Sequence, residues 1–299
     1  MKLIIDTDPG TDDALAISAA NGAEIDILGL TVVGGNVPLE LGIRNSLRVL
    51  DFLGREDVDV YPGASRPLEG EYQYAYEYHG PDGLLAEIDS SNRQKSNIQA
   101  VDFIKESVRN YPNEVTLLAL GPLTNIANCL RDDPEIVNLI DKIIIMGGAF
   151  QCKGNVNAWA EFNIFDDPVA AGEVFSIDIP MYVVGLDVCN SVSISRKELP
   201  WPLYTNGSRG QEICKNILSS WFSFHNDKDI YPLCDPLALI SCLYPEVVEY
   251  VQSEITVVQS GNEIGRTLIT SGSQNINIAK SVDGELAKNR LAELLESSG

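Results

Sequence analysis

The chain has 299 residues, 44% of them hydrophobic, so it can bury the core of one large domain or of two smaller ones. Its formal net charge of −22 argues against a nucleic-acid partner, whose phosphates attract Lys and Arg, and against an anionic membrane surface. The same charge is compatible with a neutral small molecule that binds together with a metal ion. We expect one domain over residues 1–299.

An apolar run begins close to the N-terminus, and Lys2 is the only charge before it. No apolar run reaches membrane-spanning length, so we expect neither a signal peptide nor a membrane anchor. The six cysteines form no C-x-x-C pair, and six-cysteine disulfide frameworks belong to short secreted chains. These features predict reduced thiols and a cytoplasmic location.

Apolar runs alternate with helical patterns along the first two thirds of the chain. In chain order, we expect a strand at 3–5, a helix opening at Asp12, a strand at 25–33, a helix at 39–53, a strand at 115–120, a helix at 122–130, a strand at 143–146, a helix from Asp167 and a strand at 181–186. This alternation predicts the α/β class, with an open, mostly parallel sheet flanked by helices. Later, β-rich runs within 247–278 predict an antiparallel edge near the C-terminus, before a closing helix at 284–295.

Two segments interrupt the alternation. Residues 68–84 are loop-like, and their alternating tyrosines are typical of one face of an edge strand. These tyrosines are Tyr72, Tyr74, Tyr76 and Tyr78. They could also stack on a ligand, but we expect most of them to pack, with Tyr78 nearest a site. Residues 188–234 are rich in aromatic residues, and long irregular segments in compact domains are usually binding loops or lids.

Four carboxylates lie within eight residues near the N-terminus, where a short apolar run gives way to a loop containing Pro9-Gly10. These carboxylates are Asp6, Asp8, Asp12 and Asp13. An Asp at a helix N-cap explains only one or two of them. Like charges this close disfavour joint ionisation, and Ca²⁺ or Mg²⁺ bound by oxygen ligands would relieve the repulsion. The cluster therefore predicts a metal or active site at the end of the first strand.

Polar residues also follow other predicted strands. Asn36, the Leu120-Gly121 pair and the segment from Asn155 to Asn163 each come after a strand, and Asp235-Pro236 opens a later helix. Loops at one edge of a parallel sheet converge, so these residues are expected to share one pocket. Asp235 could alternatively be only a helix cap. Asp167-Pro168 has the same local form without matching partners, and we expect it to be structural.

These blocks, in the same order, resemble those of the inosine-uridine preferring nucleoside hydrolases over residues 3–240. The stretch from Asp6 to Ala14 is fairly specific by itself, and together with Glu161-Phe162-Asn163 and Asp235-Pro236 it is highly specific. Further matching blocks lie at 35–36, 79–84, 121–125, 146–148 and 154–155.

The resemblance implies Ca²⁺-dependent hydrolysis of the N-glycosidic bond of purine or pyrimidine ribonucleosides, in nucleoside salvage or catabolism. The implied metal ligands are the carboxylates of Asp8, Asp13 and Asp235 and the main-chain carbonyl of Leu120. Asp8 would also be the general base, oriented by Asn36. The implied substrate-binding residues are Asp12, His79, Asn155, Glu161, Phe162 and Asn163. The resemblance also implies that the protein forms a homodimer or a homotetramer.

The expected chemistry has a physical rationale that does not depend on the family. Breaking a glycosidic bond builds positive charge on the sugar ring, which carboxylates and amide oxygens stabilise. Asp6 is expected to brace the loop.

One position departs from the family pattern. Many members carry a His before the late Asp, where it helps to protonate the departing base, whereas this chain has Cys234. A thiol with an ordinary pKa of about 8.5 is mostly protonated at neutral pH and is a weak proton donor. The sequence therefore leaves open whether Cys234 or His225 protonates the leaving group, and which base is preferred.

Two other functions compete with this interpretation. A metal-dependent phosphohydrolase is one, because Asp6-x-Asp8 follows a strand, but it requires a Lys or Arg for phosphate that the matching loops lack. The other is a riboside-binding protein without turnover, or one with an altered substrate, in which loss of the His accompanied loss of the reaction. Retention of Asp8 and Asn36 argues against it, since a binding protein needs no general base.

Overall fold

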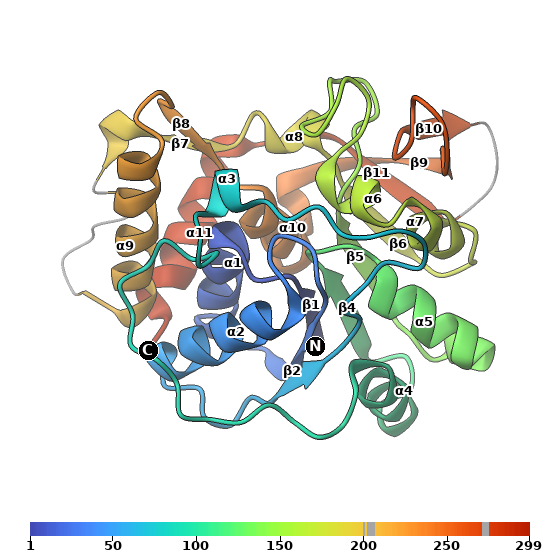
Figure 1. The fold of residues 1–299 in the computed structure, drawn as a ribbon, viewed down its shortest axis with the longest axis horizontal. Helices are drawn as coiled ribbons and strands as arrows, with labels where there is room; N and C mark the ends of the chain where they lie inside the picture. The colour runs from blue at the N-terminus through green and yellow to red at the C-terminus, as the bar shows by residue number, and fades with distance from the viewer. Residues whose placement is uncertain (200, 202–206, 271–274) are drawn as a thin grey trace.

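A central sheet of nine strands organises the fold (Figure 1). Its strands are β1 (Lys2–Thr7), β2 (Asp26–Val32), β3 (Val60–Pro62), β4 (Val115–Ala119), β5 (Lys142–Met146), β6 (Met181–Val184), β9 (Val248–Val257), β10 (Thr267–Thr270) and β11 (Ile276–Val282). They lie in the order β10-β9-β11-β6-β5-β4-β1-β2-β3. All neighbours from β3 across to β11 are parallel, while β9 and β10 pair antiparallel at one edge. The computed structural model describes residues 1–199, 201, 207–270 and 275–299.

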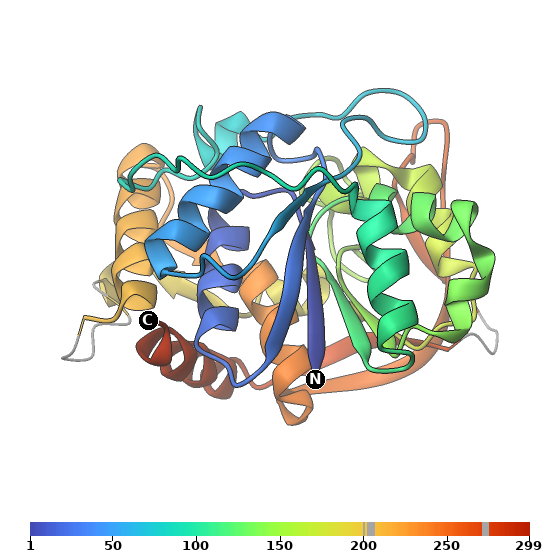
Figure 2. The same ribbon diagram turned by 90° about the horizontal axis from the view of Figure 1, so that it is seen from below.

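Helices cover both faces of the sheet, as the two orthogonal views show (Figure 2). One face carries α1 (Thr11–Asn21), α2 (Leu39–Leu53), α9 (Arg209–Phe224), α10 (Cys234–Leu243) and α11 (Gly284–Ser297). The opposite face carries α4 (Ala100–Asn110), α5 (Thr124–Asp132) and α7 (Pro168–Phe175). The shorter elements are α3 (Tyr76–His79), α6 (Phe162–Asp166), α8 (Leu186–Cys189), β7 (Ser193–Ser195), β8 (Ile230–Pro232) and 3₁₀ turns at Pro134–Asn138, Arg196–Glu198 and Pro245–Val247.

The apolar sequence of β1 explains its central place. Leu3 and Ile5 contribute to the core beneath α1, whereas Ile4 contributes to the core on the other face of the sheet. All three side chains are fully buried, as expected for a strand of a parallel sheet that is covered on both sides. A strand of this kind needs apolar residues without alternation, and Leu3-Ile4-Ile5 supplies them.

The strand order creates a crevice between β1 and β4. β1 leads into α1 on one face, whereas β4 leads into α5 on the other, so the two following loops diverge. In doubly wound sheets with the order 3-2-1-4-5-6, which β3 to β6 follow here, ligands bind at this point of divergence, outside the carboxyl ends of the strands. The cluster of acids after β1 lies at this crevice.

The predicted fold class is confirmed, including the antiparallel edge formed by β9 and β10. The helix expected at 39–53 has the same bounds as α2, and it ends at Gly54, whose φ of +74° suits a residue without a Cβ. The predicted edge strand of alternating tyrosines is wrong, because residues 76–79 form the helical turn α3.

The segment 188–234 is more regular than expected. Its aromatic residues belong mainly to α9 and β8. Trp221 and Tyr231 are buried in the core, because the amphipathic helix α9 packs against the domain and does not form an open lid. Residues 200 and 202–206 of the expected lid lie outside the described residues.

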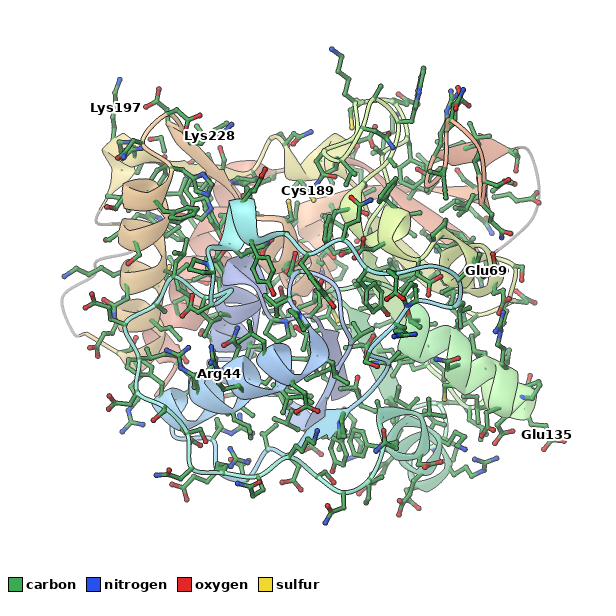
Figure 3. All side chains as sticks on the ribbon, viewed as in Figure 1. Arg44, Glu69, Glu135, Cys189, Lys197 and Lys228 are labelled. Atoms are coloured by element: carbon green, nitrogen blue, oxygen red, sulfur yellow. The ribbon has the colours of Figure 1, made fainter. Side chains whose placement is uncertain are left out.

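Many charged side chains lie at the surface of the molecule. Figure 3 shows five of them, Arg44, Glu69, Glu135, Lys197 and Lys228, and all five are exposed, whereas the labelled Cys189 is fully buried. All six cysteines are free. Among the described residues, no helix combines the length and the apolar character that crossing a membrane requires.

Candidate active site

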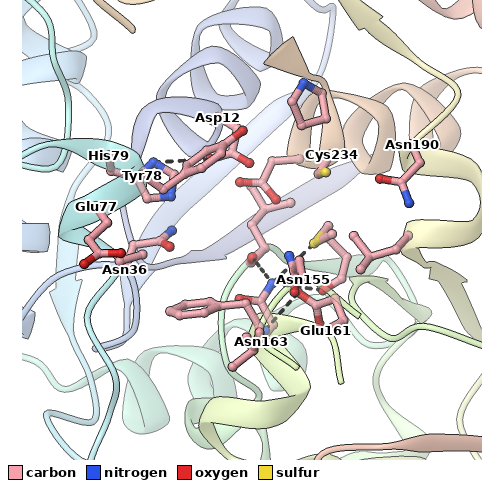
Figure 4. A pocket seen from close by; sticks show the side chains of 18 of the residues that line it. Asp12, Asn36, Glu77, Tyr78, His79, Asn155, Glu161, Asn163, Asn190 and Cys234 are labelled. Atoms are coloured by element: carbon pink, nitrogen blue, oxygen red, sulfur yellow. Dashed lines mark hydrogen bonds and ion pairs between the residues drawn. The ribbon is translucent and has the colours of Figure 1, made fainter. Parts of the chain in front are cut away.

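A cavity of about 390 Å³ lies at the crevice between β1 and β4 (Figure 4). Most residues predicted for the site line it. They are Asp12, Asn36, His79, Leu120, Asn155, Glu161, Phe162, Asn163, Cys234 and Asp235. Asp8 and Asp13 do not line the cavity, and both are fully buried in the loop after β1 and the first turn of α1.

Asp8 has one carboxylate oxygen that is engaged and one that is free. Its Oδ2 accepts a hydrogen bond of 2.7 Å from the main-chain N–H of Asn36, whereas its buried Oδ1 has no hydrogen-bond partner among the described residues. Burial, together with the charge of Asp13, raises the pKa of Asp8 well above its ordinary value. A buried carboxylate oxygen without a donor calls for a cation or a proton.

Asp13 is held rigidly at the start of α1. Its carboxylate accepts hydrogen bonds from the Thr7 hydroxyl, from the main-chain N–H of Gly10 at 2.9 Å and from Asn36 Nδ2 at 3.2 Å. An acidic residue in the first turn also benefits from the helix dipole. Asn36 therefore connects Asp8, through its main chain, with Asp13, through its side chain.

Three carboxylates converge beside Asp8. Asp12, Asp13 and Asp235 each offer an oxygen within 4.8 Å of the others. Burial and mutual repulsion raise the pKa of Asp12 to about 7, and burial with the charges of Asp12 and Asp13 raises the pKa of Asp235 well above its usual range. Oxygen ligands in this arrangement, next to the unpartnered Asp8 Oδ1, fit a hard divalent cation.

This cluster differs in part from the predicted ligand set. Asp13 and Asp235 belong to both, whereas Asp12 was predicted to bind ribose. The Leu120 carbonyl accepts a hydrogen bond of 2.6 Å from Asn163 Nδ2, which leaves its second lone pair available.

One wall of the cavity is built from α6 and the turn before it. Glu161 caps α6 by accepting hydrogen bonds from the main-chain N–H groups of Asn163 (2.9 Å) and Ile164 (3.2 Å). Asn163 Nδ2 donates to the main-chain carbonyls of Leu120 (2.6 Å) and Met146 (3.2 Å). Because both donors are directed at main-chain carbonyls, the side-chain oxygen of Asn163 remains free to accept from a ligand.

His79 and Cys234 also line the cavity. His79 accepts a hydrogen bond of 3.0 Å from the main-chain N–H of Thr11, and burial lowers its pKa to about 3, so it is neutral at physiological pH. A hydrogen bond with the Cys189 thiol and burial raise the pKa of Cys234 well above its ordinary value. Cys234 therefore remains a thiol.

His225 does not line the cavity. Its Nε2 lies 2.9 Å from the main-chain carbonyl of Tyr78, to which it donates, and its ring packs against Trp221 with centroids 4.3 Å apart. The hypothesis that His225 takes the place of the missing His is therefore not supported by its position. Asp6 and Asp167 are structural as expected: Asp6 accepts hydrogen bonds from Thr31 and Asn125, and Asp167 caps α7.

Sequence reasoning missed several residues that line the cavity. Met146 ends β5 and Leu186 follows β6, so the rule that ligands bind at strand ends could have found both. Glu77 and Asn190 come from segments without a strong pattern, whereas Tyr74 is one of the alternating tyrosines that we expected mostly to pack. Asp166 was also missed, although it holds the loop that carries Tyr74 by accepting a 3.0 Å hydrogen bond from the main-chain N–H of Gln73.

Comparisons with known proteins identify the family of the chain. The inosine-uridine preferring nucleoside hydrolase family matches residues 3–289. The chain is 37% identical to uridine nucleosidase 1 of Arabidopsis thaliana over 286 residues, which are 92% of this chain and 84% of that protein. A solved plant nucleoside hydrolase, the PpNRh1 enzyme, superposes with a TM-score of 0.93 at 34% identity and covers 98% of each chain.

A purine-preferring ribonucleoside hydrolase from Gardnerella vaginalis gives a TM-score of 0.91 at 33% identity, over 100% of this chain and 99% of that one. The fold and the cavity thus define an N-glycosyl hydrolase that acts on nucleosides. The chain belongs to the inosine-uridine preferring nucleoside hydrolase family.

The close contact between Gly35 and Asp8 gives a first prediction. A Cβ at Gly35 would lie 2.1 Å from Asp8 Oδ2, so Gly35→Ala must displace this carboxylate. We expect a divalent cation held by this cluster to bind at least about tenfold more weakly, as the loss of one contact to a charged group predicts. Isothermal titration calorimetry with Ca²⁺ measures the affinity of each variant. Gly284→Ala, whose Cβ meets nothing closer than 3.5 Å, is the control, and equal affinities of the two variants would contradict the prediction.

The raised pKa values of the buried acids predict how stability depends on pH. The folded pKa of Asp12 is about 7 and that of Asp166 about 8, both above the values of an unfolded chain. A raised folded pKa contributes stability at low pH that is lost as pH rises through the folded pKa. The free energy of unfolding of metal-depleted protein should therefore fall between about pH 5 and pH 8, and a bound divalent cation should stabilise the protein more at the upper end of this range.

Thermal melts of the depleted and Ca²⁺-loaded protein across this range test the expectation. In Asp235→Asn, which removes one of the clustered charges, the fall with pH should be smaller. A melting temperature of the depleted protein that rises with pH would contradict it.

Proposed function

We propose that this nucleoside hydrolase is Ca²⁺-dependent and releases ribose and free base from purine or pyrimidine ribonucleosides, in nucleoside salvage or catabolism. The observation that carries the proposal is the free, buried Oδ1 of Asp8 beside the carboxylate cluster at the cavity. A hydrolase needs a base for water in such a position, whereas a binding protein has no use for one.

The metal would be held by the carboxylates of Asp8, Asp13 and Asp235 and by the main-chain carbonyl of Leu120. Three features support this set: the free oxygen of Asp8, the proximity of Asp13 to Asp235, and the place of Leu120 on the cavity wall. When bound, the ion would lower the pKa of a water molecule and bind sugar hydroxyls. Calcium suits oxygen ligands of mixed type better than a soft metal does.

Asp8 is the proposed general base. Asn36 fixes its orientation by donating to Oδ2 at 2.7 Å, and the carboxylate would take a proton from the attacking water. Asn36 also anchors Asp13, which keeps the two carboxylates in a fixed relation. Preorganisation of this kind removes the need to reorient groups during the reaction.

The sugar would bind against the acidic and amide groups of the cavity. Asp12 and Glu161 supply negative charge, while Asn155 and Asn163 supply amide groups for the hydroxyls. As the glycosidic bond breaks, positive charge develops on the ring, and fixed carboxylates would stabilise that charge.

The leaving base would face the aromatic and thiol side of the cavity. Phe162, Tyr78 and His79 line the cavity and offer ring faces and a hydrogen-bond donor. Cys234 stays protonated, so its S–H can donate to the base without delivering a full proton. The proton of the departing base would then come from water or the base itself would leave as an anion.

A phosphohydrolase fits the site poorly. The described residues that line the cavity include neither Lys nor Arg, whereas phosphate recognition relies on these cations.

Ribose release is the direct test of the proposed reaction. Purified protein is incubated with inosine, adenosine, guanosine, uridine or cytidine, with Ca²⁺ or with a chelator, and reducing sugar is assayed. Release that the chelator abolishes is expected. Asp8→Asn should lower kcat by about 10²- to 10⁴-fold, the range attributed to general bases. Asp26→Asn, an exposed acid paired with Lys2, is the charge-matched control.

Near-normal turnover in Asp8→Asn would refute the role of the base. Nucleosides that stabilise the protein without releasing sugar would instead indicate a binding protein.

The thiol at position 234 yields a separate prediction. Cys234→His introduces a group that can protonate a leaving base, and purine and pyrimidine bases differ in how much protonation they need. We expect kcat for uridine and for inosine to change by different factors, and Cys234→Ser to show no such divergence. Equal and negligible changes for both nucleosides would remove Cys234 from the mechanism.

A further inference from the structure

His79 faces two hydrogen-bond donors from a single residue. The main-chain N–H of Thr11 lies 3.0 Å from His79 Nδ1, and the Thr11 hydroxyl lies 2.9 Å from the same atom. An amide N–H can only donate, so Nδ1 must present its lone pair and carry no proton. The geometry of the first turn of α1 thereby selects one tautomer of the imidazole.

A third buried group sets the direction of this chain of hydrogen bonds. Tyr231 donates its hydroxyl hydrogen to Thr11 Oγ1 at 3.0 Å, and both residues are fully buried. Since the Thr11 oxygen accepts from Tyr231, its own hydrogen is free to point at His79 Nδ1. Successive donors polarise one another and strengthen the final bond.

The other neighbours of the His79 ring do not favour a proton on Nδ1. Asp12 would favour a proton on Nδ1, but its carboxylate lies 3.9 Å away, beyond hydrogen-bond distance. Gly10 lets the ring approach the main chain, because a Cβ there would lie 2.7 Å from two atoms of the imidazole. Tyr78 contacts the ring only by an edge, with centroids 4.8 Å apart.

The single proton of neutral His79 is therefore on Nε2. Among the described residues, none accepts a hydrogen bond from this nitrogen, and His79 lines the cavity (Figure 4). The cavity thus receives a fixed donor from this residue.

We propose that Thr11 and Tyr231 are positioning residues that hold His79 as the Nε2–H tautomer, so that His79 recognises an acceptor atom of the bound nucleoside and takes no proton from it. The identity of the ligand rests on the proposed function, whereas the tautomer does not. Two hydroxyls remote from the reacting bond would then determine which edge of a substrate the site accepts.

NMR of the full-length, Ca²⁺-loaded protein labelled at its histidine nitrogens tests the tautomer directly. The chain contains only two histidines, so His225→Gln assigns both sets of signals. The expected spectrum of His79 has an unprotonated Nδ1 and a protonated Nε2. A protonated Nδ1, or an average of the two tautomers, would overturn the proposal.

Matched variants test the two positioning residues. Thr11→Val removes the hydroxyl, and Tyr231→Phe removes the first donor while leaving the loop intact. Both should move the Nδ1 signal toward that of a nitrogen with weaker hydrogen bonding, and raise KM by about fivefold, as the loss of one hydrogen bond predicts. Thr11→Ser restores the hydroxyl and should restore both readouts.

Wild-type signals and KM in Thr11→Val and Tyr231→Phe would refute the positioning roles. The Ca²⁺ affinity of each variant is measured by titration. If Thr11→Val no longer binds Ca²⁺, the NMR signal and KM of Tyr231→Phe alone test the positioning role. Hydrolysis by a chain whose His79 is protonated at Nδ1 would refute this inference alone. The Nε2–H tautomer in a chain that hydrolyses no nucleoside would refute the proposed function alone.

Discussion

The crowding of buried carboxylates at the carboxyl end of β1 is the constraint on which the site depends. Asp8, Asp12, Asp13 and Asp235 repel one another, and burial raises their pKa values, so the arrangement is stable only with bound protons or a bound cation. Main-chain N–H groups and Asn36 hold the carboxylates in place regardless of this repulsion. The repulsion between the carboxylates therefore lowers the local stability, while the hydrogen bonds keep the site preorganised.

The sheet makes this arrangement possible. Because β1 and β4 lead to helices on opposite faces, their loops separate and leave a crevice into which carboxylates can point. Two glycines let the main chain approach the Asp8 carboxylate closely, because a Cβ at Gly35 or at Gly121 would collide with it. Below it, Asp6 ties β1 to β2 and α5 through Thr31 and Asn125, so the support is itself hydrogen-bonded.

The cavity combines two kinds of chemistry. Carboxylates and amide groups line it together with a neutral histidine and a protonated thiol. In the proposed mechanism the negative groups stabilise the sugar, and donors of modest acidity interact with the base.

The sequence by itself determined the α/β class, the bounds of α2 and most residues of the cavity, because apolar periodicity and the blocks at strand ends are local patterns. It could not place Tyr76–His79, where tertiary contacts of Thr11 and His225 hold a helical turn against strand-like alternation. Nor could it show that Tyr231 and Thr11, 220 positions apart, act on His79, or that Asp12 joins Asp13 and Asp235. Only the tertiary structure decided these, because hydrogen bonds between distant segments leave no periodic trace in the chain.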